Sequence, residues 1–160
     1  MYFPALVRLF KAGTHHILEN ALFKRLSPSE FVQIKTQEHY DRWLEKAAED
    51  SCWAACTKDE IEEVRWGLFA KVINIIVYEI VSQRELCSES DCQRLRSFLH
   101  VPIDSIVIDH LRQIDPKFQA RTKLKGMTKD EFWRIQNVIR VMARENDVPP
   151  IWFEAAWSAT

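Results

Sequence analysis

Apolar residues recur along most of the chain at steps of three and four positions, the period of an α-helix that buries one face. The strongest pattern predicts a central helix over roughly 58–83, with apolar positions Val64, Leu68, Val72, Ile73, Ile75, Ile76, Val77 and Ile80. Only Lys71, Asn74 and Glu79 interrupt its most apolar stretch. A second strong pattern predicts a helix over about 129–146, which Pro149-Pro150 must end.

Three sequences of the capping-box type mark further helix starts. Each places a hydroxyl at the cap and a glutamate three residues later, and a first helical turn favours such acids. The three are Ser27-Pro28-Ser29-Glu30, Thr57-Lys58-Asp59-Glu60 and Thr128-Lys129-Asp130-Glu131. Weaker periodicity predicts an N-terminal helix, a helix through Tyr40 and Ala48 that ends before Thr57, and helices over about 89–99 and 103–113. A short aromatic segment follows Pro150. No strand pattern competes, so residues 1–160 are expected to form an all-α, single-domain helical bundle of about seven helices.

Composition removes several classes of function. With three glycines in 160 residues, the chain holds neither a P-loop nor a dinucleotide fingerprint. The formal net charge of −1 supplies no overall positive field, so any nucleic-acid binding must be local.

Compartment and cofactors are also indicated by the sequence. The first residues do not form a signal segment and the apolar stretch Leu68 to Val81 is too short to span a bilayer, which favours a cytoplasmic protein without a membrane partner. Its four cysteines should then stay reduced. Their spacings match no common zinc pattern, so neither a metal nor an organic cofactor is expected.

One local basic stretch is a candidate nucleic-acid contact. Residues 116–129 contain no acid but five bases: Lys117, Arg121, Lys123, Lys125 and Lys129. A solvated surface is one interpretation. The other is a loop that contacts phosphate and leads into the helix that starts near Lys129, whose free backbone N–H groups can also hold a phosphate.

Two segments resemble parts of the helix-hairpin-helix DNA glycosylase superfamily. Trp66-Gly67-Leu68-Phe69-Ala70-Lys71-Val72-Ile73-Asn74-Ile75-Ile76 is similar to the helix before the hairpin of those enzymes. Val101-Pro102-Ile103-Asp104-Ser105-Ile106-Val107-Ile108-Asp109-His110-Leu111 resembles the segment after it, where a catalytic aspartate precedes an apolar helix. The chain's last helices are similar to those of archaeal oxoguanine-glycosylase-like proteins, so the resemblance covers roughly 64–157. It implies a helical protein that binds DNA or excises a base.

The resemblance carries one catalytic position, Asp104, which would stabilise the cationic sugar or assist a nucleophile. An aspartate at this point also suits a helix cap. The family's glycine-rich hairpin and the nucleophilic lysine after it are not found, because residues 68–125 contain no glycine. Lys71 matches a lysine that is not the nucleophile, and a solvated or snorkelling side chain is the simpler interpretation. Whether the chain is an enzyme stays open.

Two alternatives remain. One is a non-catalytic helical module that kept the scaffold and binds a protein partner or a second copy of the chain. The other is a helical ribonuclease, suggested by the R-x5-H pair Arg94 and His100. A glycosylase should place Lys123 and Lys125 on a concave face with Asp104, whereas an interaction module should use Asp104 as a helix cap.

Overall fold

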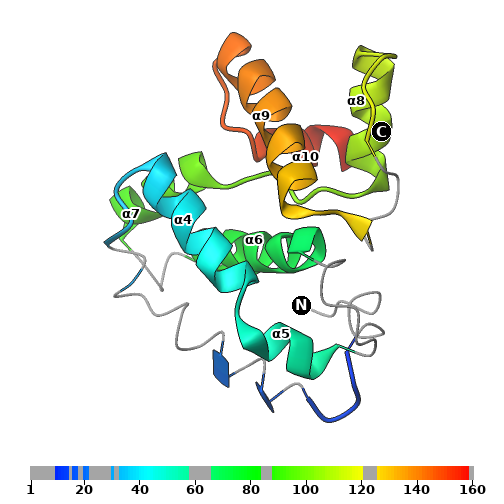
Figure 1. The fold of residues 1–160 in the computed structure, drawn as a ribbon. Helices are drawn as coiled ribbons and strands as arrows, with labels where there is room; N and C mark the ends of the chain where they lie inside the picture. Colours follow the sequence, from blue (N-terminus) through cyan, green and yellow to red (C-terminus); the bar gives the residue numbers. More distant parts are fainter. Residues whose placement is uncertain are drawn as a thin grey trace.

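A computed structural model describes residues 10–14, 16–17, 20–21, 30, 33–57, 66–83, 88–120 and 126–158. Its helices are α4 (Gln37–Ala48), α5 (Ser51–Cys56), α6 (Trp66–Ser82), α7 (Glu89–Phe98), α8 (Ser105–Ile114), α9 (Lys129–Glu145) and α10 (Trp152–Ser158) (Figure 1). Over these ranges no strand forms, and a single antiparallel bridge joins Phe10 to Thr57. The expected all-α class is confirmed.

Helix α6 lies at the centre, as its apolar pattern predicts. It packs against α4, α7 and α9, and its buried side chains include Leu68, Ile73 and Val77. In Figure 1, α8 and α9 extend away from α6 on the same side, and α10 lies between them. At the start of α6 a Cβ built on Gly67 would lie 2.7 Å from Met127 Cβ, so only glycine fits there without a shift.

The helix starts that can be checked follow local capping chemistry. The Thr128 hydroxyl accepts from the Glu131 backbone N–H at 3.2 Å, which confirms the start of α9, and Ser88 caps α7 in the same way through Asp91. Helices α7 and α9 match the predicted bounds within one residue. The starts predicted near 28 and 58, and most of the N-terminal helix, lie outside the described residues.

The helix through Tyr40 and Ala48 ends before Thr57, as predicted, because α4 stops at Ala48. A separate helix that the pattern does not predict, α5, follows it, because Asp50 adopts an extended conformation and caps α5 by accepting from the Cys52 N–H at 2.9 Å. One helix bound needs a small correction. Helix α8 begins at Ser105 rather than 103, because Asp104 is its cap.

The expectation that all four cysteines are reduced is also wrong. Cys92, at the buried face of α7, is disulfide-bonded, whereas Cys52 and Cys56 are free.

Candidate functional site

Asp104 occupies the N-cap of α8. Its Oδ1 accepts from the Val107 backbone N–H at 3.0 Å, and its Oδ2 lies 3.0 Å from Nζ of Lys71 on α6. The Asp104 side chain is 33% exposed and the Lys71 side chain 17% exposed. The carboxylate is therefore held by one helix, paired with another and still open to solvent.

Lys71 is thus not the solvated side chain that its sequence context favours. It points to a partner 33 positions away, in the segment that leads into α8. The ion pair joins the two segments that carry the glycosylase resemblance, through one charged residue from each.

The charges of this pair act on a third titratable group, Glu154 of α10. Burial raises the pKa of Glu154 above its ordinary 4.5, Asp104 and Glu79 raise it further, and Lys71 opposes them. The carboxyl is half-buried, and its side chain makes no hydrogen bond or ion pair with another described residue. Helix α10 packs on α8, where the Trp157 ring stacks on His110 with centroids 5.4 Å apart.

The basic stretch is only partly described. Lys117 is exposed in the turn after α8, at the opposite end of that helix from Asp104, and Arg121, Lys123 and Lys125 lie outside the described residues. Lys129 lies 3.1 Å from Glu45 of α4 and 2.8 Å from Glu49, which follows α4, and the hydrogen bond to Glu49 raises the pKa of Lys129. Its charge is therefore matched by two carboxylates.

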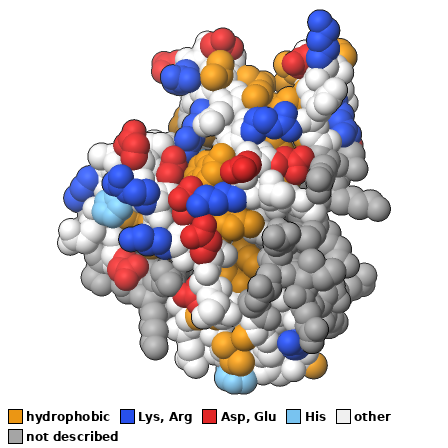
Figure 2. All heavy atoms as spheres, in the orientation of Figure 1, with side chains coloured by type: hydrophobic (Ala, Val, Ile, Leu, Met, Phe, Trp, Pro, Cys, Tyr) orange, Lys and Arg blue, Asp and Glu red, His pale blue; other side chains and the backbone are white. Residues whose placement is uncertain are grey.

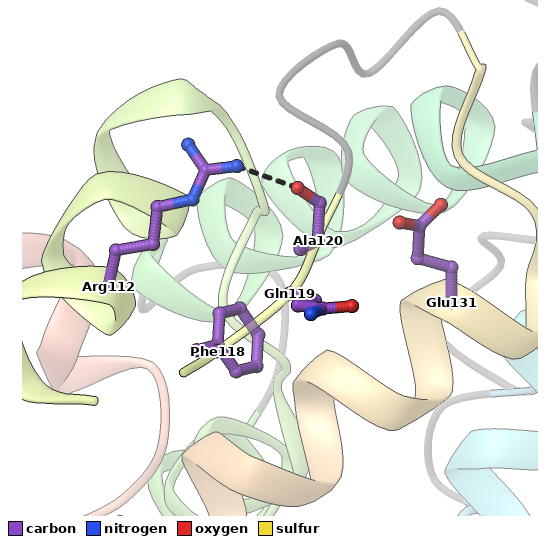
Figure 3. A pocket seen from close by; sticks show the side chains of 5 residues that line it. All are labelled: Arg112, Phe118, Gln119, Ala120 and Glu131. Atoms are coloured by element: carbon purple, nitrogen blue, oxygen red, sulfur yellow. Dashed lines mark hydrogen bonds between the residues drawn. The ribbon is translucent and has the colours of Figure 1, made fainter. Parts of the chain in front are cut away.

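A pocket of roughly 370 Å³ lies between α8 and α9 (Figure 3), lined by Arg112, Phe118, Gln119, Ala120 and Glu131. Arg112 donates to the Ala120 carbonyl at 2.7 Å, and the Arg134 guanidinium lies 5.6 Å from the centre of the Phe118 ring. Both arginines thus hold the loop after α8. Because Arg112 follows Asp104 by eight residues, about 12 Å of helix separates this pocket from the Lys71–Asp104 pair.

A second hollow, of roughly 320 Å³, lies at the N-terminus of α9, where the sequence suggests a phosphate. It is lined by Thr128, Asp130, Glu131 and Arg134, so two carboxylates oppose an anion there. On the face that Figure 2 shows, acidic and basic side chains are interspersed over the described residues rather than gathered into a basic strip.

His100 lies in the core. It is fully buried, and its Nε2 lies 2.8 Å from Oδ1 of Asp41 on α4, which also accepts from Arg140 of α9 at 2.7 Å. Burial lowers the pKa of His100 below its ordinary 6.5, against the effect of Asp41. Arg94 donates to the Ile34 carbonyl at 3.0 Å. Nothing in this arrangement offers the R-x5-H pair to a phosphodiester.

No group of three potential metal ligands occurs in the described ranges, and none of the helices described there is long and apolar enough to cross a membrane. Comparison of the chain with protein-family models, curated proteins and solved structures finds no match. The glycosylase resemblance therefore depends on its motif residues and on the contact that joins them.

Proposed function

We propose that this chain is a DNA-glycosylase-like protein that binds DNA and acts on a base, with Asp104 and Lys71 at the centre of its site. One observation carries the proposal: the 3.0 Å ion pair connects the helix similar to the one before the family hairpin with the segment similar to the one after it. The residues between those segments differ from the family, and the side chains of Lys71 and Asp104 meet across them.

The geometry suits electrostatic stabilisation of a cationic sugar. A fixed carboxylate stabilises positive charge that develops as a glycosidic bond breaks, and it costs little reorganisation when a backbone N–H already orients it. Val107 supplies that N–H and Lys71 holds the other oxygen. Asp104 is thus the charged group facing the substrate, and Lys71 is a positioning residue.

Substitution at Asp104 tests the proposal without unfolding α8. Asn caps helices about as well as Asp, so Asp104→Asn keeps the cap and removes the charge. The matched control is Asp109→Asn, on the same helix with a 61% exposed side chain. Labelled single-stranded and duplex oligonucleotides, each carrying one 8-oxoguanine, uracil or hypoxanthine, are titrated at two salt concentrations and assayed for free base.

We expect binding that weakens steeply with salt, and base release that Asp104→Asn abolishes and Asp109→Asn retains. The absence of binding at low salt refutes the proposal.

The competing function is a non-catalytic interaction module. Two observations favour it: Asp104 is a helix cap, as that hypothesis expects, and several large apolar side chains are exposed on α8, α9 and α10. These are Ile106, Ile114, Val141 and Trp152, of which Trp152 is the most exposed at 61%. Failure of every oligonucleotide to bind, together with a concentration-dependent mass of the purified chain, would support this function.

A further inference from the structure

Five buried polar atoms lie around the Trp133 ring without a hydrogen-bonding partner among the described residues. They are Nε1 of Trp66, Nε1 of Trp133, Nδ1 of His100, Oε1 of Gln136 and Nε of Arg140. One other buried atom of this kind occurs over the same ranges, on Arg94, and it lies 2.6 Å from a carboxylate oxygen of Asp91. Buried polar atoms are almost always hydrogen-bonded, and water serves where the chain supplies no partner. A cluster of five therefore indicates a bound partner rather than five separate defects.

Ring contacts and one hydrogen bond bring these side chains together. The centre of the Trp133 ring lies 5.2 Å from that of His100 and 6.0 Å from that of Trp66. The guanidinium carbon of Arg140 lies 5.6 Å from the same ring centre. Gln136 follows Trp133 by about one turn of α9, and its Nε2 donates at 2.7 Å to the carbonyl of the residue after His100. Helices α6 and α9 and the chain between α7 and α8 thus surround one polar region of the core.

The protonation of His100 decides which of these atoms donate. Burial raises the pKa of Asp41, but its hydrogen bonds to His100 and Arg140 outweigh burial and leave that pKa below 3.8. Since the resulting carboxylate only accepts, Nε2 of His100, 2.8 Å from Oδ1 of Asp41, carries a hydrogen. Burial lowers the pKa of His100 below 6.5, so its ring is neutral at pH 7 and Nδ1 presents a lone pair. His100 Nδ1 and Gln136 Oε1 are therefore acceptors, whereas the indole and guanidinium N–H groups are donors.

This mixture of donors and acceptors selects the ligand. An anion can accept from the three N–H groups but is repelled by the two lone pairs. A cation can use the two lone pairs but is repelled by the three N–H groups. Water donates two hydrogen bonds and accepts two, so it satisfies both kinds of atom and needs no space larger than its own volume.

We propose that the core binds water between Trp133, His100 and Gln136, as an internal site that joins α6 and α9 to the chain before α8. The position of the site gives it a consequence for the start of α8. Gln136 holds the Val101 carbonyl, three residues before the cap Asp104. Water that fixes Gln136 therefore also fixes the chain that leads into Asp104. The inference does not depend on the proposed function, because it holds whatever Asp104 does.

Nuclear Overhauser spectroscopy of the ¹⁵N-labelled full chain in water tests the proposal. Water that stays bound for longer than the protein takes to tumble gives an indole N–H an effect opposite in sign to that of rapidly exchanging surface water. We expect the bound-water sign at Trp133 and the surface-water sign at Trp152, which is 61% exposed and serves as an internal reference. The ¹⁵N shifts of the His100 ring should show a neutral imidazole protonated at Nε2.

Gln136→Met is the deciding variant, because it keeps the length of the side chain and removes the acceptor. The bound-water effect at Trp133 should be lost in Gln136→Met. Gln113→Met, the same substitution at an exposed glutamine on α8, is the matched control and should retain the effect. Should Gln136→Met not fold, the wild-type spectrum and the His100 shifts decide alone.

The outcomes that overturn the proposal are distinct. A wild-type spectrum without the bound-water sign at Trp133 refutes the site. An effect that Gln136→Met leaves unchanged, or that Gln113→Met also removes, refutes the part of Gln136 in it. A His100 ring protonated at Nδ1 refutes the part of His100, since that nitrogen then has no lone pair to offer.

Discussion

The two roles of Asp104, capping α8 and pairing with Lys71, can be separated by unfolding experiments. Asp104→Asn retains a capping oxygen and loses the ion pair, so it should cost about 0.5–1 kcal/mol, the upper range for an exposed pair. We use the upper range for this ion pair because the side chains of Lys71 and Asp104 are at most one-third exposed. Asp104→Ala loses the cap as well, which adds about 1 kcal/mol. The alanine variant should therefore be about 1.5–2 kcal/mol less stable than the wild type.

Urea unfolding followed by far-ultraviolet circular dichroism measures these differences. Lys71→Met keeps the apolar stem, and the double variant Lys71→Met with Asp104→Asn closes a thermodynamic cycle. The cycle should give a coupling free energy of about 0.5–1 kcal/mol. A coupling indistinguishable from zero, or an asparagine variant as unstable as the alanine variant, refutes the separation of the two roles.

Three further predictions concern the core. Asp41→Ala should destabilise the protein by about 3 kcal/mol in urea, because it leaves His100 and Arg140 without their shared carboxylate, whereas Asp109→Ala should cost less than about 1 kcal/mol. The folded-state pKa of His100 is lowered, so as the pH falls the unfolded chain takes up a proton on His100 before the folded chain does. The contribution of His100 to the free energy of unfolding should therefore be fully present above pH 6.5, fall as the pH drops below 6.5, and level off below the folded-state pKa. Urea midpoints from pH 8 to 5 check this, and His100→Gln should remove the slope. Gly67→Ala should destabilise by about 1 kcal/mol or more despite the better helix propensity of alanine, since the added Cβ meets Met127; a higher melting temperature would contradict the close approach.

Local signals explain which helices could be predicted. Thr128 and the apolar period after it define α9 within one residue, because cap and periodicity lie within one segment. The break between α4 and α5 also has a local signal, Asp50 followed by Ser51, but the small apolar residues on either side hide it by continuing a helical period. The apolar pattern predicts the start of α8 two residues too early, because Ile103 fits the helical period although it is buried before the helix begins.

The site was less predictable for a physical reason. Asp104 could be found because a family motif and a capping position both point to it. The pairing of Lys71 with Asp104 spans 33 positions, and the influence of Asp104 on Glu154 spans 50. Neither follows from spacing, since both depend on how α6, α8 and α10 pack. The sequence context of Glu154, a short segment rich in tryptophan, indicates packing rather than chemistry.

The polar interruptions of α6 show where chemistry can occur in this fold. Asn74 is fully buried. Its Oδ1 accepts from the Tyr40 hydroxyl at 2.9 Å and from the backbone N–H of His100 at 3.3 Å. Its side-chain amide donates to the Ala70 carbonyl at 2.9 Å. Such a satisfied network stabilises one packing arrangement but offers nothing to a ligand.

Lys71, one turn before Asn74, is less buried than Asn74, and its polar contact is open to solvent. Its partner is one-third exposed, and the neighbouring Glu154 has no partner among the described residues. The same helix thus has a closed polar contact toward α4 and an open one toward α8 and α10. That solvent-open contact at Asp104 is why we propose the chemistry there and not at His100, whose polar partners close around it in the core.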